Sequence, residues 1–207
     1  MSYDMIIGLA GVHEKGIMHR DLKPENVFVN VAENAPLDGD SQAIIGDFGS
    51  SRKLGGPNEV QELSEYVVTR WYRAPEIILS RGQYSTAIDI WSLGTIIYEM
   101  ITLKGCFQGD NETEIIQEII NTLGNPDERK MIDYCDEDAI EPLLEMKATR
   151  NKTFASERFY TASQALQDLV RSCLKWNPFE RPSAQELLQN PIFKKFQTAY
   201  ELSQNGS

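Results

Sequence analysis

The chain has 207 residues, 41% of them hydrophobic and 25% charged, and a formal net charge of −11 at pH 7. This length and composition suit one soluble globular domain. The acidic balance argues against binding to nucleic acid, whose phosphates require Lys and Arg, and against binding to an anionic membrane surface. We therefore expect neither a nucleic-acid partner nor a membrane partner.

The negative charge is concentrated in one part of the chain. Between Asp110 and Glu145, twelve acidic residues are accompanied only by Arg129 and Lys130 among basic residues. The simpler interpretation is that these carboxylates provide solubility, and docking of a basic partner is the alternative.

The cysteines and the N-terminal sequence indicate a compartment. Cys106, Cys135 and Cys173 are odd in number and lack metal-ligand spacing, so a reducing environment is expected. The first residues lack the pattern of a signal peptide, and no apolar stretch has the length of a membrane span. We expect a cytoplasmic or nuclear protein.

In chain order, the first predicted elements are a helix and a hairpin. Apolar residues at helical spacing predict a helix from Met1 to about Gly16. Residues 27–31 and 43–45 predict two short strands, separated by a loop that contains Pro and Gly. Residues 50–72 show no sustained period and predict a long irregular loop.

The second half of the chain predicts further helices. Residues 87–101 are apolar almost all round, which is typical of a helix in the middle of a core. Asn111 and Glu114 resemble a capping box that opens the next helix, and Gly124 ends that helix.

Beyond Gly124 the helical signals become less regular. Residues 127–160 are acidic and weakly periodic. Helices are expected around residues 162–174 and 183–189, the second with a capping box formed by Ser183 and Glu186. A polar tail occupies residues 197–207.

Three short motifs follow one another along the chain. They are His19-Arg20-Asp21-Leu22-Lys23-Pro24-Glu25-Asn26, then Asp47-Phe48-Gly49, and then Ala74-Pro75-Glu76. Each alone is weak, because most loop aspartates are cap or turn residues. The ordered set resembles the catalytic loop, the metal-binding loop and the end of the activation segment of a eukaryotic protein kinase.

The resemblance implies a fold and its boundaries. Residues 1–196 are similar to the C-terminal lobe of a kinase domain, a mainly α-helical bundle around a buried central helix. A short β-hairpin would carry the catalytic loop and the Asp-Phe-Gly loop.

The resemblance also implies roles for the site residues, with ATP and Mg²⁺ as cofactors. Asp21 would orient the attacking hydroxyl and accept its proton, and Lys23 would place a cation near the transferred phosphate. Asn26 and Asp47 would offer oxygens to the metal, and Phe28 would face the adenine.

Other matching residues are expected to hold the site without reacting. By analogy with the family, Asp89 holds the backbone of the catalytic loop, and Arg181 pairs with Glu76. His19 is expected to pack beneath the loop next to Phe48. We expect His13 to be a surface residue.

The run from Val67 to Glu76 resembles the CMGC group, which includes cyclin-dependent, MAP, glycogen synthase and MAK/MOK-like kinases. In this group Arg73 satisfies the carbonyl of the residue that matches Val68, which favours a proline after the phosphorylated Ser or Thr. Thr69 and Arg70 would help position the substrate and phosphate groups.

Ser64 and Tyr66 stand where MAP and MAK/MOK-like kinases carry a Thr-x-Tyr phosphorylation motif. Phosphates there would pair with Arg20, Arg70 and Arg73, which implies an upstream activating kinase. An unmodified Ser and Tyr are the alternative. Protein substrates, and a docking partner on the insert over residues 124–160, are the other partners that the resemblance implies.

Parts of the kinase pattern are missing from the chain. It has no Gly-x-Gly-x-x-Gly loop and no strand lysine for the nucleotide phosphates, so we expect the N-terminal lobe to be absent. One interpretation is the catalytic half of a proline-directed Ser/Thr kinase, and the other is a non-catalytic interaction module. We expect the chain alone to bind Mg-ATP weakly and to have little activity.

Overall fold

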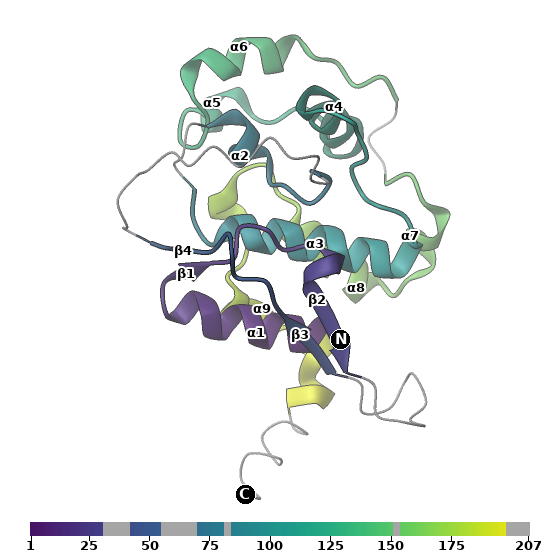
Figure 1. The fold of residues 1–207 in the computed structure, drawn as a ribbon. Helices are drawn as coiled ribbons and strands as arrows, with labels where there is room; N and C mark the ends of the chain where they lie inside the picture. The colour runs from purple at the N-terminus through teal and green to yellow at the C-terminus, as the bar shows by residue number, and fades with distance from the viewer. Residues whose placement is uncertain (31–41, 55–69, 81–83, 151–153, 198–207) are drawn as a thin grey trace, which may run out of the picture.

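The computed structural model describes residues 1–30, 42–54, 70–80, 84–150 and 154–197 (Figure 1). Helices dominate, as the sequence predicted, and the strands are short. The helices are α1 (Ser2–Glu14), α2 (Pro75–Leu79), α3 (Ala87–Thr102), α4 (Glu112–Leu123), α5 (Glu128–Met131), α6 (Glu137–Glu145), α7 (Glu157–Thr161), α8 (Gln164–Cys173) and α9 (Ala184–Leu188). Three 3-10 turns are η1 (Pro24–Asn26), η2 (Pro178–Glu180) and η3 (Pro191–Phe193).

Helix α3 is the centre of the core, and α1, α7, α8 and η2 pack against it. Most of its residues are apolar, so it can be surrounded by other elements, and its buried Asp89, Ser92, Thr95 and Thr102 side chains each make hydrogen bonds. Trp91 in its second turn is fully buried and stacks on Phe107, with the ring centroids 5.3 Å apart. The helix ends at Leu103, which has a left-handed backbone with φ 58°.

A glycine allows α8 to approach α3 closely. A Cβ atom added to Gly94 would lie 2.7 Å from the Cβ of Cys173. Such a contact is far inside the van der Waals distance, so only glycine permits this crossing. Gly94 is therefore required for the packing of α8 on α3.

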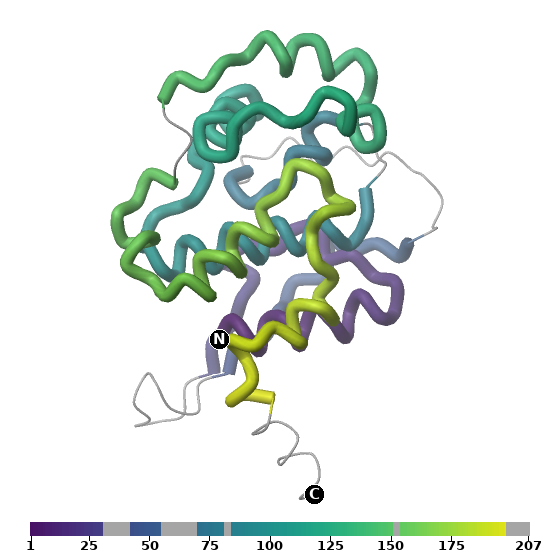
Figure 2. The backbone as a smooth tube through the Cα atoms, turned by 180° about the vertical axis from the view of Figure 1, so that it is seen from behind, coloured from purple at the N-terminus to yellow at the C-terminus, as the bar shows by residue number. Residues whose placement is uncertain are grey.

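Two small antiparallel sheets lie beside α1. Strand β2 (Val27–Asn30) pairs with β3 (Gln42–Ile45) in the register Val27↔Ile45, which confirms the predicted hairpin. Strand β1 (Ile17–Met18) pairs with β4 (Arg52–Lys53). Strand β4 lies within residues 50–72, which the sequence predicted to be an irregular loop. Seen from behind, α9 lies beside α1 at the end of the molecule where the chain begins (Figure 2).

Helix caps confirm most of the predicted helix starts. Ser183 and Glu186 form the predicted capping box of α9. At α4 the Asn111 side chain accepts the Glu114 N–H, but Glu114 accepts the N–H of Asp110 rather than that of the cap residue. The pattern therefore predicted the start of α4 correctly, but the Glu114 side chain bonds to the backbone of Asp110, one residue before the predicted partner Asn111.

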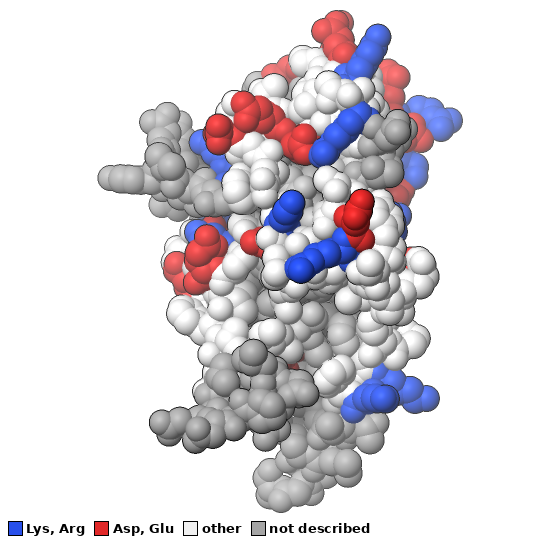
Figure 3. All heavy atoms as spheres, turned by 90° about the vertical axis from the view of Figure 1, so that its right-hand side faces the viewer, with Lys and Arg blue, Asp and Glu red and all other residues white. Residues whose placement is uncertain are grey.

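The acidic segment after α4 contains three short helices, α5, α6 and α7, where the sequence showed only weak periodicity. On the side of the molecule where α7 lies, acidic and basic side chains are interspersed (Figure 3). Within the described part of the chain, no helix has both the length and the apolar character of a membrane span.

Candidate active site

The catalytic loop is anchored to the central helix by Asp89, as predicted. Asp89 stands in the first turn of α3 and is 1% exposed. Its Oδ2 accepts the backbone N–H of His19 at 2.8 Å, and its Oδ1 accepts the backbone N–H of Arg20 at 2.9 Å. Two charge-assisted hydrogen bonds to consecutive amides fix the direction of the loop just before Asp21. Arg20 has a positive φ of 71°, so the chain turns sharply at this point.

The prediction that His13 is a surface residue was wrong. Its Nε2 atom lies 2.8 Å from Asp89 Oδ2, and only 10% of its side chain is exposed. His13 occupies the last turn of α1, so α1, the catalytic loop and α3 meet at one carboxylate. The contact spans 76 residues of sequence, and no local pattern reports it.

Asp21, Lys23 and Asn26 come together, as predicted. Lys23 Nζ donates to Asp21 Oδ2 at 2.7 Å. The Asn26 amide nitrogen donates to the Asp21 carbonyl at 2.7 Å and reaches Asp21 Oδ2 at 3.2 Å. Because the amide nitrogen faces Asp21, the amide oxygen of Asn26 is the atom left for another partner.

Asp47 reaches the same region through the hairpin. The Gly46 N–H donates to the Asn26 carbonyl at 2.9 Å, which brings the residue before Asp47 against the end of the catalytic loop. Asp47 has a positive φ of 56° and an exposed side chain whose Oδ1 accepts the Gly49 N–H at 3.2 Å. A backbone hydrogen bond therefore orients the Asp47 carboxylate, which remains open to solvent.

His19 supports this loop from below, as predicted. It is fully buried, and its Nε2 lies 2.9 Å from the Gly46 carbonyl oxygen. Its ring meets Phe48 edge-on, with centroids 4.9 Å apart. The histidine thus links the catalytic loop to the loop that carries Asp47.

The hairpin presents an apolar surface to solvent. Phe28 is 58% exposed, and Val29, Ile44 and Phe48 are exposed with it. A Cβ on Gly46 would lie 2.5 Å from the Phe28 ring, so glycine at position 46 lets this ring lie flat over the strand end. An exposed ring beside a carboxylate and an amide suits the flat base and phosphates of a nucleotide.

Arg73 lies near the catalytic loop. It lines a narrow hollow with Asp21 and Lys23. Burial lowers the pKa of Arg73, and the neighbouring Arg70 adds to this effect. Both guanidinium groups approach the Glu112 carboxylate, at 3.8 Å for Arg73 and 3.6 Å for Arg70.

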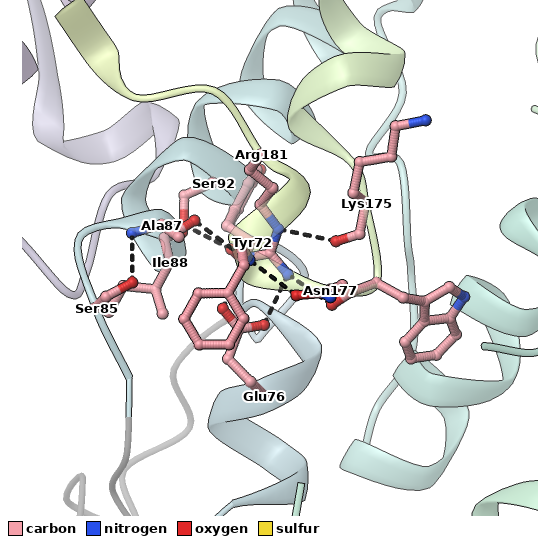
Figure 4. Close-up of polar contacts among 11 residues, drawn as sticks. Tyr72, Glu76, Ser85, Ala87, Ile88, Ser92, Lys175, Asn177 and Arg181 are labelled. Atoms are coloured by element: carbon pink, nitrogen blue, oxygen red, sulfur yellow. Dashed lines mark hydrogen bonds and ion pairs between the residues drawn. The ribbon is translucent and has the colours of Figure 1, made fainter. Parts of the chain in front are cut away.

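The predicted pair between Arg181 and Glu76 is present and fully buried (Figure 4). Two parallel bonds of 2.6 and 2.8 Å join the guanidinium to the carboxylate. Arg181 also donates to the Ala87 carbonyl at 3.0 Å and lies over the Trp91 ring at 4.9 Å. The end of the activation segment is thereby fixed to the core beneath α3.

Sequence reasoning missed three side chains that tie this region together. Ser92 Oγ donates to the Tyr72 carbonyl at 2.7 Å, and the Tyr72 hydroxyl donates to Glu99 at 2.7 Å. Burial and the Glu99 carboxylate raise the pKa of Tyr72. Tyr84 accepts a hydrogen bond from Arg20 at 3.3 Å. Nothing in the sequence around these residues signals the contacts.

Four predicted positions, Ser64, Tyr66, Val68 and Thr69, lie outside the described residues. The predicted phosphorylation sites and the carbonyl expected to meet Arg73 therefore remain predictions.

The donor set fits a hard cation that also binds phosphate. In the described ranges, no three His, Cys, Asp or Glu side chains gather as a metal cluster. Asp47 and Asn26 offer one carboxylate and one amide oxygen, and Mg²⁺ commonly takes only one or two protein oxygens and completes its shell with phosphate and water.

Comparisons with known proteins identify the family. The protein kinase domain family matches residues 1–193. The chain belongs to the protein kinase domain family. This confirms the resemblance inferred from the three motifs, and the mainly helical fold around α3 is the kinase-like C-lobe that it implied.

The relatives of this kinase domain include MAP kinases and a cyclin-dependent kinase, as the Arg73 motif predicted. Mitogen-activated protein kinase 5 of Oryza sativa subsp. indica is 35% identical over 193 residues, which are 93% of the chain and 49% of that protein. Cyclin-dependent kinase F-4 of Oryza sativa subsp. japonica is 34% identical over 194 residues, 93% of the chain and 39% of that protein. Mitogen-activated protein kinase 13 of Homo sapiens is 35% identical over 199 residues, 96% of the chain and 51% of that protein. The kinase domain chain thus spans about half or less of these relatives.

Proposed function

We propose that the chain supplies the catalytic loop and the metal-binding residues of a protein Ser/Thr kinase that transfers the ATP γ-phosphate to Ser or Thr hydroxyls. The observation that carries the proposal is the junction of Asp21, Lys23 and Asn26, joined to the Asp47 loop through the Gly46–Asn26 bond. An interaction module without catalysis would have no need of these four polar side chains at one place.

Each residue has a task that its geometry supports. Asp21 orients the substrate hydroxyl and accepts its proton. Lys23, held at 2.7 Å from Asp21, adds positive charge where the transferred phosphate develops negative charge. Asn26 and Asp47 would hold Mg²⁺, which neutralises the phosphates when bound.

The exposed ring of Phe28 would form the floor of the nucleotide site. With Val29, Ile44 and Phe48 it forms an exposed apolar surface, and such surfaces often mark a contact with a ligand or another protein segment. We propose that a further segment with a glycine-rich loop and a strand lysine covers it in the active enzyme. Chain ahead of Met1 or a second polypeptide would serve equally.

Proline-directed specificity is the finer part of the proposal. Arg73 is partly buried beside the catalytic loop, where its guanidinium can satisfy a backbone carbonyl of the activation segment. A substrate residue after the phosphorylated Ser or Thr then finds no acceptor for its N–H, and proline has no N–H to satisfy. Phosphorylation at Ser64 and Tyr66 would add charge that Arg20, Arg70 and Arg73 can pair with.

The test joins the N-terminal half of a MAP kinase to this chain ahead of Met1. We expect the chimera to phosphorylate a Ser-Pro peptide and the 207-residue chain to be nearly inactive. Asp21→Asn should lower the activity of the chimera at least about a thousandfold and leave the chimera folded. A folded chimera whose activity survives Asp21→Asn contradicts the catalytic assignment.

The same chimera tests specificity. A peptide with Ser-Pro should be phosphorylated at least about tenfold faster than its Ser-Ala counterpart, and Arg73→Met should remove most of this preference. Equal rates for both peptides would reject proline direction while leaving the kinase assignment intact.

The exposed hairpin also supports the second interpretation, a non-catalytic module that binds regulators through this surface. The acidic insert with α5 and α6 is a second place for a basic protein partner, as the sequence suggested. An inactive chimera that still binds Mg-ATP would favour this alternative.

A further inference from the structure

A second cavity lies away from the catalytic loop. It has a volume of about 410 Å³ and opens between the α4–α5 loop and the segment from α8 to η2. None of the residues assigned to phosphoryl transfer lines it. Its volume lies within the range of small-molecule sites, and nothing in the kinase assignment uses it.

The walls of this cavity are fixed to the core. Trp176 Nε1 donates to the Gly124 carbonyl at 2.8 Å, which ties one wall to the other. Arg181 donates to the Lys175 carbonyl at 2.8 Å and to the Trp176 carbonyl at 3.2 Å. Because Arg181 is itself locked to Glu76, the shape of the cavity is set before any ligand arrives.

Aromatic side chains form part of the lining. Trp176 is the partly exposed aromatic residue of the lining, and the nearly buried Phe154 and Tyr134 lie behind it in the wall. The guanidinium of Arg171 lies 5.1 Å from the Phe154 ring centroid. Rings of this kind stack well on a flat ligand, and a guanidinium held over a ring keeps its donors free for an anion.

The charge of the lining is unusual for a chain with a net charge of −11. Its two carboxylates are already paired, Asp127 with Arg129 at 3.1 Å and Glu180 with Lys130 at 2.5 Å. Arg171 and Lys175 have no carboxylate partner among the residues that the structure describes. Figure 4 shows the Lys175 carbonyl turned to Arg181 and its ammonium group pointing away.

We propose that this cavity binds a compact aromatic anion, with its ring against Trp176 and its carboxylate or phosphate facing Arg171 and Lys175. The rigid walls, the aromatic lining and two cations without a carboxylate partner point to the same ligand chemistry. The site is separate from phosphoryl transfer and does not depend on it.

The experiment titrates the purified 207-residue chain with 1-naphthoate, 1-naphthyl phosphate and neutral 1-naphthol, following the indole N–H signals by ¹H–¹⁵N NMR. The chain has three Trp residues, and Trp176→Phe assigns the reporting signal. We expect both anions to shift the Trp176 signal with a dissociation constant on the order of 1 mM or below, and 1-naphthol to bind at least tenfold more weakly. The stronger of the two anions identifies a carboxylate or a phosphate as the natural head group.

Two variants give the decisive contrast. Arg171→Gln combined with Lys175→Gln should weaken binding about tenfold, because it removes both charges and leaves the rings. Lys175→Gln alone, at an exposed position, provides a milder version that should fold normally. Lys104→Gln, an exposed lysine outside the cavity, is the matched control and should bind as the unchanged chain does.

Several results would overturn the proposal. They are equal affinity for 1-naphthol and 1-naphthoate, unchanged affinity in a folded Arg171/Lys175 variant, and binding that leaves the Trp176 signal unmoved. Octanoate binding as tightly as 1-naphthoate would also reject it, because the rings would then have no role.

Discussion

The region around Arg181 and the catalytic hairpin treat charge in opposite ways. The Arg181 and Glu76 side chains are 0% and 1% exposed, and two parallel hydrogen bonds join the guanidinium to the carboxylate. Asp47 on the hairpin is exposed, and its Oδ1 accepts the nearby Gly49 N–H. The buried pair holds the end of the activation segment to the core, whereas the exposed Asp47 carboxylate keeps lone pairs free for the metal ion proposed above.

This difference separates stability from chemistry within one lobe. Removing one partner of a buried ion pair lowers the free energy of unfolding strongly, because the other charge remains buried without a countercharge. Replacing an exposed carboxylate should change the free energy of unfolding little and should affect only ligand binding. The following substitutions test whether the two regions behave in these two ways.

The largest effect is expected at the closed pair. Glu76→Gln leaves the Arg181 guanidinium buried without a countercharge and should lower the free energy of unfolding by about 3–5 kcal/mol. Urea denaturation followed by circular dichroism measures it. Lys130→Gln, which breaks a pair that is about half exposed, is the control and should cost less than about 1 kcal/mol. Similar losses in the two variants would falsify the comparison.

Helix packing gives the next effect. Gly94→Ala places a methyl group 2.7 Å from the Cys173 Cβ, so α3 and α8 must separate, at a cost of about 1–3 kcal/mol. Gly11→Ala in α1 is the matched control, because no atom lies within 4 Å of the added Cβ. It should raise stability by about 0.5–1 kcal/mol through helix propensity, and thermal unfolding of both variants shows the opposite signs.

Alkaline pH should weaken the core. Burial raises the pKa of Cys173 from 9.0 to about 12, and that of Cys135 likewise. Between pH 9 and 12 the unfolded thiols lose protons that the folded thiols keep, so alkali favours unfolding. Each thiol adds a loss of up to about 1.4 kcal/mol per pH unit, and the effect is absent below pH 9. Cys173→Ala should make the pH dependence of unfolding shallower by one such contribution, and an unchanged slope would contradict the burial effect.

The smallest effect on stability is expected at the open carboxylate. Asp47→Asn keeps a residue that tolerates positive φ, so the free energy of unfolding should change by less than about 0.5 kcal/mol. The same change should abolish activity in the chimera with a MAP kinase N-terminal half. A large loss of stability would show that Asp47 holds the fold, contrary to its exposure.

Sequence motifs predicted the parts of the site whose partners the kinase resemblance supplied. The Asp89 anchor, the Arg181–Glu76 pair and the position of His19 beside Phe48 were all confirmed. Helix α3 followed from its long and nearly continuous apolar run, and the β2–β3 hairpin from two short apolar runs separated by turn residues.

The missed features depend on contacts that no local pattern contains. His13 meets Asp89 across 76 residues, and β4 is two residues long and defined only by its pairing with β1. Helix α6 is nine residues long and contains Pro142, a residue that usually interrupts a helix, so its sequence did not predict it clearly. Tertiary packing, and not intrinsic propensity, decides such short elements.

The meeting of three donors at Asp89 sets the proton position on a histidine ring. A carboxylate has only lone pairs to offer, so the His13 atom that faces Asp89 Oδ2 must be Nε2–H. The ring nitrogen shifts of His13 consequently report the contact between α1 and Asp89, the residue that anchors the catalytic loop, since breaking that contact would free the proton to move to Nδ1. The imidazole signal of His13 would then reveal whether a ligand, a covering segment or a mutation has disturbed the contacts of Asp89, which hold the loop that carries Asp21.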